Sequence, residues 1–242
     1  MSQIIKNDGL RFVCDDPIEV ARARTVFEKE TGTIHWLREQ VQPGDVVFDI
    51  GANIGVYTLL AARIVGPQGI VYAFEPHIVN AAQLLRNVAA NRREDTVRVL
   101  TTALGAVPEW ATFYCRSLRP GSSGSALGPV TWQSAAALMV QSASVESLVK
   151  SGVGPPADVI KIDVDGRELD VLRGMSGLLM SGHTRSVQVE MAPASSAAIL
   201  TFMRAHGYAL AGRHFTSLGR QAIERGADPA TITDNAIFMR AA

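Results

Sequence analysis

The chain has 242 residues, of which 47% are hydrophobic, and its 23 lysines and arginines balance its 23 aspartates and glutamates. This length favours one α/β domain with a large core over two domains. The balanced charge provides no overall attraction to nucleic acid or to an anionic membrane, which argues against a polynucleotide substrate.

We treat the whole chain as one domain, in which a leading segment at residues 1–42 precedes a core at 43–242. Within the leading segment, residues 1–16 suit a short strand or hairpin. Residues 17–40 carry an interrupted helical stripe of apolar side chains, which predicts two helices divided at 31–33. This segment could cover a ligand as a lid or pack on the edge of the sheet, and the sequence leaves both interpretations open.

The start of the chain has no apolar stretch typical of a secretory signal, and the longest uncharged stretch, at 120–145, is too polar to span a bilayer. We therefore expect a cytoplasmic protein that does not enter a membrane. Cys14 and Cys115 follow no pattern of a metal site or disulfide framework, so we expect two reduced thiols.

The first core unit is predicted at residues 45–55, with the sequence DVVFDIGANIG. Its apolar run suits a strand buried on both faces, and a helical pattern follows from about Asn53. Asp49 falls at the carboxyl end of the strand, the edge where open α/β sheets bind ligands. Gly51 and Gly55 lack a Cβ atom, so the backbone can turn sharply and a ligand can lie against it.

A second unit is predicted to follow, with a strand at 69–74 and another strand at 97–100. Glu75 falls at the tip of the earlier strand, where nucleotide-binding α/β folds place an acid that accepts hydrogen bonds from ribose hydroxyls. The alternative is an acid of the first helical turn, stabilised by the helix dipole. The helix between the strands is expected to bury an apolar face made of Ile78, Ala82, Leu85 and Val88.

An insertion at 109–145 interrupts the alternation of strands and helices. Segments 111–116 and 138–145 have the composition of strands, and a loop rich in serine and glycine joins them. Long loops inside compact domains are usually functional or disordered, so we expect a mobile loop beside the site.

The alternation then resumes, which predicts a mostly parallel sheet with helices on both faces. The expected strands lie at 158–164, 186–190, 208–211 and 236–239, with one helix beyond the first of them and another at 195–206.

Charged residues alternate along the strand at 158–164 and just beyond it. Lys161, Asp163 and Asp165 are expected to project to one side, because successive strand residues point to opposite faces. Burying them unpaired would cost several kcal/mol, so they must pair with each other, with neighbours or with a ligand. An internal ion pair that only fixes the strand end remains one interpretation, but the position of Asp163 at the carboxyl edge favours a residue of the site.

Five segments, in this order, resemble the FkbM-type S-adenosylmethionine-dependent methyltransferases. They are VVFDIGANIGVYTLLAA at 46–62, YAFEPH at 72–77, ALG at 103–105, VIKIDVDGRELDVLRGM at 159–175 and VQVEM at 187–191. The chain departs from the family at Asp165, where glutamate is more usual.

This resemblance implies a class I methyltransferase fold, an α/β Rossmann-like fold whose seven-stranded sheet has the order 3-2-1-4-5-7-6 and an antiparallel seventh strand. It also implies S-adenosylmethionine as cofactor and S-adenosylhomocysteine as product, with Glu75 at the ribose and Asp163 near the sulfonium. The other implied cofactor-binding residues are Asp49, Gly51, Ala52, Asn53, Gly55 and Tyr57 in the loop and helix, Pro76, and Thr102, Ala103 and Leu104 near the adenine.

The family typically methylates hydroxyl groups of small molecules such as sugars and polyketide-type secondary metabolites, so the resemblance implies a hydroxyl acceptor. The enzyme must position the acceptor oxygen in line with the methyl group and remove its proton. Candidate residues for this step are Asp163, Glu190, Lys161, His214 and His35, with the carboxylates ranked above the histidines. A divalent ion held by Asp163, Asp165 and Glu190 is an alternative that we do not favour.

Other functions are disfavoured by particular motifs. A nicotinamide-dependent oxidoreductase would also carry an acid like Glu75, but the chain has G-x-x-x-G and lacks the G-x-G-x-x-G fingerprint. A nucleic-acid N-methyltransferase would carry Asn/Asp-Pro-Pro-Tyr/Phe where residues 162–166 read IDVDG. N-methylation of another acceptor and an inactive binding domain remain alternatives, and a homodimer is compatible with the sequence.

Overall fold

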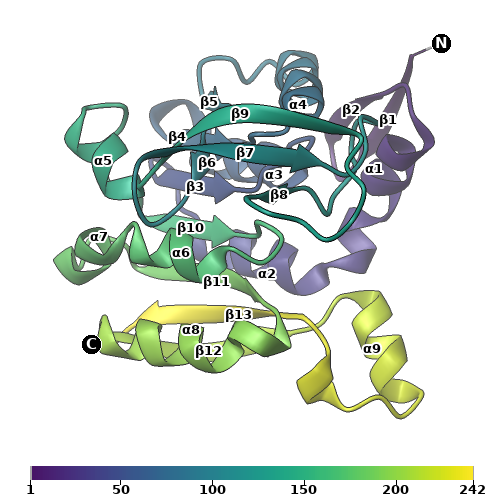
Figure 1. The fold of residues 1–242 in the computed structure, drawn as a ribbon. Coiled ribbons are helices and arrows are strands. Elements are labelled where there is room, and N and C mark those ends of the chain that lie inside the picture. Colours follow the sequence, from purple (N-terminus) through teal and green to yellow (C-terminus); the bar gives the residue numbers. More distant parts are fainter. Residues whose placement is uncertain (1, 242) are drawn as a thin grey trace.

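A seven-stranded sheet lies at the centre of the structure, a computed structural model that describes residues 2–241 (Figure 1). Its strands are β3 (Val46–Ile50), β4 (Ile70–Phe74), β5 (Val97–Leu100), β10 (Val159–Ile162), β11 (Ser186–Met191), β12 (Tyr208–His214) and β13 (Asp234–Arg240). They are arranged in the order β12-β13-β11-β10-β3-β4-β5, and only β13 runs antiparallel to its neighbours.

Numbered within this sheet alone, the order reads 3-2-1-4-5-7-6 with the last strand antiparallel. Numbered along the whole chain, the described residues form thirteen strands and not the expected seven, so the strand numbers in the order also differ. The six further strands form two other sheets. A hairpin of β1 (Gln3–Asn7) and β2 (Leu10–Cys14) is one of them.

Both faces of the central sheet are buried. Successive residues of β3, Val47 and Phe48, belong to different hydrophobic clusters, and so do Val159 and Ile160 of β10. Helices α1 (Pro17–Lys29), α2 (Thr31–Gln40), α3 (Val56–Val65) and α4 (Ile78–Ala90) contribute to one cluster. Helices α5 (Val145–Lys150), α6 (Glu168–Arg173), α7 (Ser176–Ser181) and α8 (Pro193–Ala205) contribute to the other.

The remaining helical elements are α9 (Ser217–Glu224) and two 3-10 turns at Gly66–Gln68 and Pro229–Thr231. No helix within residues 2–241 is both long enough and apolar enough to cross a membrane. Cys14 and Cys115 are both buried and unpaired.

The leading segment forms the hairpin and the two helices that its pattern predicts. The helices part at Glu30, slightly earlier than expected, because residues 31–33 already belong to the first turn of α2. Asp16 fixes the start of α1 through a capping box, in which its side chain accepts from the Ile18 amide at 2.8 Å and Glu19 accepts from the Asp16 amide at 2.8 Å.

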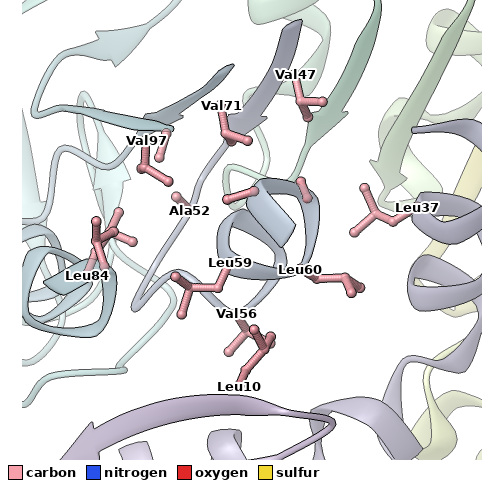
Figure 2. Close-up of a cluster of buried hydrophobic side chains, with 14 of the residues drawn as sticks. Leu10, Leu37, Val47, Ala52, Val56, Leu59, Leu60, Val71, Leu84 and Val97 are labelled. Carbon is pink, nitrogen blue, oxygen red and sulfur yellow. The ribbon is translucent and has the colours of Figure 1, made fainter. Parts of the chain in front are cut away.

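Helix α3 begins at Val56, later than the expected start near Asn53, because the glycine turn occupies the residues between them. Figure 2 shows its side chains in the buried cluster, with Leu59 directed toward α4 and Leu60 toward α2. Full burial of a leucine side chain stabilises a fold by roughly 1.5–3 kcal/mol. This packing against α4 and α2 holds α3 in place, and with it the loop that precedes the helix.

The prediction for the buried face of α4 is correct only for Val88, one of its four residues, which is 3% exposed. Ile78 and Leu85 are 52% and 55% exposed, whereas polar Asn87 is buried. Asn87 accepts from the Val13 amide at 2.8 Å and donates to the Ile54 carbonyl at 2.8 Å. Backbone partners from the hairpin and the glycine turn satisfy this polar face, and an apolar pattern cannot reveal them.

The insertion, together with a short strand just before it, forms a separate sheet in the order β6-β9-β7-β8. Its strands are β6 (Ala103–Leu104), β7 (Glu109–Cys115), β8 (Ala126–Leu127) and β9 (Ala136–Ala143). Strands β7 and β9 pair antiparallel, in agreement with the two strands expected here, but β9 ends before α5 begins at Val145.

Two C-terminal expectations also need correction. The strand expected at 158–164 ends at Ile162, so Asp163 and Asp165 lie in the turn after it. The single helix expected beyond this strand is divided into α6 and α7.

Candidate active site

A cavity of about 390 Å³ lies at the carboxyl ends of β3, β4 and β10. Its wall combines the glycine turn after β3, the residues after β4 and β5, the turn after β10, one side of α1 and part of the loop between β7 and β8. Parallel α/β sheets bind their ligands at this edge, so the cavity is the candidate site.

Gly51 allows two strand ends to approach each other closely. Its φ is 80°, and a Cβ atom there would lie 1.7 Å from the carbonyl oxygen of Asp163. At Gly55, where φ is 86°, a Cβ atom would lie 2.0 Å from the side chain of Leu84. Glycine is therefore required at both positions by the surrounding protein, in addition to any ligand that the turn holds.

Glu75 is held by two backbone amides at the rim of the glycine turn. Its Oε2 accepts from the Asn53 amide at 2.6 Å, and its Oε1 accepts from the His77 amide at 2.8 Å. Burial raises the pKa of Glu75 to about 7, although both hydrogen bonds favour the ionised form. Each carboxylate oxygen keeps a further lone pair, so Glu75 can still accept from ligand hydroxyls.

Lys161 lies between two acids beneath the cavity. Its Nζ is 3.1 Å from Oδ1 of Asp49 and 3.8 Å from Oδ2 of Asp163, and the side chains of Lys161 and Asp49 are each 2% exposed. Burial alone would lower the pKa of Lys161, but Asp49 and Asp163 raise it above its ordinary value. Lys161 therefore stays charged and connects the ends of β3 and β10 without lining the cavity.

Most of the expected cofactor-binding residues line the cavity. They are Gly51, Ala52, Asn53, Tyr57, Glu75, Pro76, Thr102, Ala103, Leu104 and Asp163. Asp49 and Gly55 are not in the wall. Asp49 accepts from Oγ1 of Thr58 at 2.6 Å below the turn, so both residues shape the turn from beneath.

Glu190 follows Val189 of β11, which pairs with Ile162 of β10, so it neighbours Asp163 at the sheet edge. It does not line the cavity. The charge of Asp163, followed by burial and other nearby carboxylates, raises the pKa of Glu190 to about 9. The raised pKa disfavours Glu190 as the proton acceptor, and Asp163 is the better-placed carboxylate because it lines the cavity.

We expect Glu190→Gln to stabilise the protein more at pH 7 than at pH 5. The folded pKa of Glu190 is raised from an ordinary 4.5 to about 9, so between these values the folded state binds more protons than the unfolded state and stability falls as the pH rises. The contribution is about 1.4 kcal/mol per pH unit, or roughly 2–3 kcal/mol between pH 5 and 7. Urea unfolding of both proteins at the two pH values measures the difference.

Glu28, which is exposed on α1, provides the control. The substitution Glu28→Gln should change the unfolding free energy by less than about 0.5 kcal/mol at either pH. A gain for Glu190→Gln that is the same at pH 5 and pH 7 would contradict the raised pKa of Glu190.

Neither histidine considered for proton transfer lines the cavity. Nε2 of His214 is 3.1 Å from Oγ1 of Thr33, and burial, together with Arg220, lowers the pKa of His214 to about 4. A Cβ atom at Gly32 would collide with this ring, so His214 packs α2 against β12. The side chain of His35 is 74% exposed on α2.

Several residues of the wall carry no motif that sequence analysis could find. Helix α1 contributes Arg22, and Glu30, which separates α1 from α2, also lines the cavity. The loop between β7 and β8 is fastened to the site, because the side-chain amides of Asn53 and Asn80 each donate to the Ser122 carbonyl at 3.0 Å. For these residues, the sequence offered only the expectation that the leading segment and the serine-rich loop lie near the site.

The geometry gives no support to a metal site. Within the described residues, no group of three or more His, Cys, Asp or Glu side chains is arranged to hold an ion. Asp165, one of the acids considered for Mg²⁺, has a φ of 55° and accepts from the Gly124 amide at 2.8 Å. Its side chain therefore holds the β7–β8 loop and does not follow the alternation of β10.

Comparison with known families and proteins identifies methyltransferases. The family model described as the methyltransferase FkbM domain matches residues 49–210. The hexuronic acid methyltransferase AglP of Haloferax volcanii is 31% identical over 171 residues, which cover 71% of this chain and 66% of AglP. The 31-O-demethyl-FK506 methyltransferase FkbM of Streptomyces tacrolimicus is 40% identical over 75 residues, which cover 31% of this chain and 28% of FkbM. Each match spans less than two thirds of the relative's length.

Solved methyltransferase structures share the fold. An FkbM methyltransferase of Methylobacillus flagellatus aligns over 93% of this chain and 55% of its own, with a TM-score of 0.50 and 14% identity. A tRNA methyltransferase of M. jannaschii aligns over 100% of this chain and 57% of its own, with a TM-score of 0.54 and 10% identity. At these identities the similarity establishes the α/β methyltransferase fold alone.

Proposed function

Because the chain belongs to the FkbM methyltransferase family, we propose that it transfers a methyl group from S-adenosylmethionine to a hydroxyl oxygen of a small molecule. The observation that carries this proposal is the convergence of the glycine turn, Glu75 and Asp163 in one cavity. This combination offers a turn open to a ligand, an acid for ribose hydroxyls and a carboxylate at the adjacent strand end.

The residues present fit this cofactor. Glu75 retains lone pairs for the ribose hydroxyls, and residues 102–104 would flank the adenine. Oη of Tyr57 is buried in the wall and has no hydrogen-bond partner among the described residues. An unpaired buried donor of this kind costs about 1–3 kcal/mol unless a ligand satisfies it.

When bound, the cofactor supplies a methyl group on a positively charged sulfur. Asp163 would accept the proton of the acceptor hydroxyl, whose oxygen must be held in line with that methyl group. Lys161 stabilises the charge of Asp163 from below at 3.8 Å. The loop fastened by Asn53 and Asn80 would restrict the access of water to the reacting groups.

The names of the relatives support a small hydroxylated acceptor. One is described as acting on a hexuronic acid, and the other on an O-demethylated compound. We therefore propose a sugar, a sugar acid or a polyketide-type metabolite as the acceptor class. Neither a nucleic acid nor a membrane is part of this proposal.

Methyl transfer from radiolabelled S-adenosylmethionine to a panel of neutral sugars, sugar acids and hydroxylated polyketides tests the function. We expect label in an alkali-stable methyl ether on one class. The variant Asp163→Asn should transfer label about 10²- to 10⁴-fold more slowly, because it lacks the proton acceptor. Label found only in an alkali-labile ester or on an amine would contradict hydroxyl methylation, and wild-type turnover in Asp163→Asn would remove its catalytic role.

A further inference from the structure

Arg22 is a cavity residue that neither the cofactor motifs nor the proposed proton transfer uses. It lies on α1 and is half-buried in the cavity wall. Its Nε donates to the carbonyl oxygen of Gly121, which fixes the base of the guanidinium group. The ion pairs formed within residues 2–241 leave Arg22 without a carboxylate partner, although a half-buried guanidinium group normally has one.

Two other cationic side chains at the site are already paired with carboxylates. Lys161 is buried between Asp49 and Asp163. Nε of Arg167, which also lines the cavity, is 3.0 Å from Oδ2 of Asp170. Lys29 is the last residue of α1, where the helix dipole already favours a cation. Arg22 and Lys29 thus form no ion pair within residues 2–241, and Arg22 is the one whose position is fixed, by its hydrogen bond to the Gly121 carbonyl.

The surroundings of Arg22 point to the methionine end of the cofactor. Burial and the nearby carboxylate of Glu30, followed by that of Asp163, raise the pKa of Tyr57, and the positive charge of Arg22 opposes them, so Arg22 lies close enough to act on this phenol. Tyr57 lies in the first turn of α3, and its buried hydroxyl makes no hydrogen bond of good geometry within residues 2–241. Helix α3 is capped by Gly55, which provides no side-chain acceptor for the free amides of that turn. A carboxylate there would meet a guanidinium group, a phenol and the positive end of a helix.

We propose that Arg22 binds the α-carboxylate of S-adenosylmethionine. This inference rests on the proposed function, because it assigns a role within the same cofactor site. The methionine end of the cofactor carries one carboxylate, one ammonium group and the sulfonium. Asp163 and Glu30 provide negative charge for the two cationic groups, and the guanidinium fork of Arg22 matches the two oxygens of the carboxylate.

The test compares two ligands that differ only in this carboxylate. Calorimetry measures the affinities of S-adenosylmethionine and of its decarboxylated analogue, S-adenosylmethioninamine, for the wild type, Arg22→Met and Arg22→Lys. We expect Arg22→Met to weaken binding of S-adenosylmethionine about 10- to 100-fold and binding of the analogue less than threefold. Arg22→Lys keeps the charge but not the fork, so its loss should be intermediate.

Arg24→Met is the matched control, since Arg24 is exposed on the same helix and does not line the cavity. It should leave both affinities within twofold of the wild type. Equal losses of affinity for both ligands in Arg22→Met would show that Arg22 only holds the loop at Gly121. Unchanged affinity for S-adenosylmethionine would show that its α-carboxylate binds elsewhere. Either result overturns the proposal. Failure of the wild type to bind either ligand would instead refute the proposed function.

Discussion

Lys161→Met is expected to destabilise the protein by about 3–5 kcal/mol, the usual cost of removing one partner of a buried ion pair. The ammonium group lies 3.1 Å from Asp49, and both side chains are 2% exposed, so no solvent replaces the lost charge. Asp163 would also lose its partner at 3.8 Å. We therefore expect weaker cofactor binding along with the loss of stability, because both acids border the glycine turn.

Urea unfolding and calorimetric titration with S-adenosylhomocysteine measure the two effects. Lys150→Met is the matched control, since Lys150 is 78% exposed and 3.6 Å from Glu146, and it should cost less than about 1 kcal/mol. The double variant Lys161→Met/Asp49→Asn should recover part of the stability, because it removes one of the uncompensated charges. A loss in Lys161→Met no larger than that in Lys150→Met would mean that the buried pair does not support the fold.

Gly51→Ala is expected to be the most damaging of the small substitutions. Alanine at a φ of 80° costs about 1–2 kcal/mol, and its Cβ would lie 1.7 Å from the Asp163 carbonyl oxygen, so the ends of β3 and β10 must separate. Displacement of packed elements adds about 1–3 kcal/mol. The separation also moves the glycine turn away from Asp163, so cofactor binding should fall at least tenfold.

Gly44 isolates the effect of this close approach. Its φ is 88°, and a Cβ atom there would meet nothing within 4 Å. Gly44→Ala should therefore cost only the backbone term, about 1–2 kcal/mol, and leave cofactor affinity unchanged. Equal destabilisation of the two variants in thermal unfolding would show that the ends of β3 and β10 can separate at Gly51 without a further cost in stability.

The core of the fold could be predicted because its signals are local. Asp49 and Glu75 stand at the carboxyl ends of the apolar runs of β3 and β4, and Gly51 follows β3 where the backbone must turn, so the signals for strand end and turn agree. The face of α4 could not be predicted, since the buried side chain of Asn87 depends on backbone groups of a distant hairpin. Two strands of the extra sheet were expected, whereas β6 and β8 were not, since each is only two residues long.

The candidate site divides in the same way. Motif residues such as Glu75 and Asp163 reach the cavity wall as expected. Lys161 and Glu190 were placed on the correct strand ends, but sequence could not distinguish a side chain lining the cavity from one buried below or beside it. Sequence analysis did not identify Arg22 as a residue of the site, because α1 lines the cavity only once the chain has folded and the helix packs across it.

Calorimetric titration of the wild type and of Glu75→Ala with S-adenosylhomocysteine tests the central claim most directly, with NAD as the comparison ligand. The structure predicts saturable one-to-one binding of S-adenosylhomocysteine to the wild type and no binding of NAD. It also predicts that Glu75→Ala weakens binding by about 10- to 100-fold, through the loss of hydrogen bonds to the ribose. Equal affinity in both proteins, or binding of NAD in place of S-adenosylhomocysteine, would contradict the assignment of the cavity.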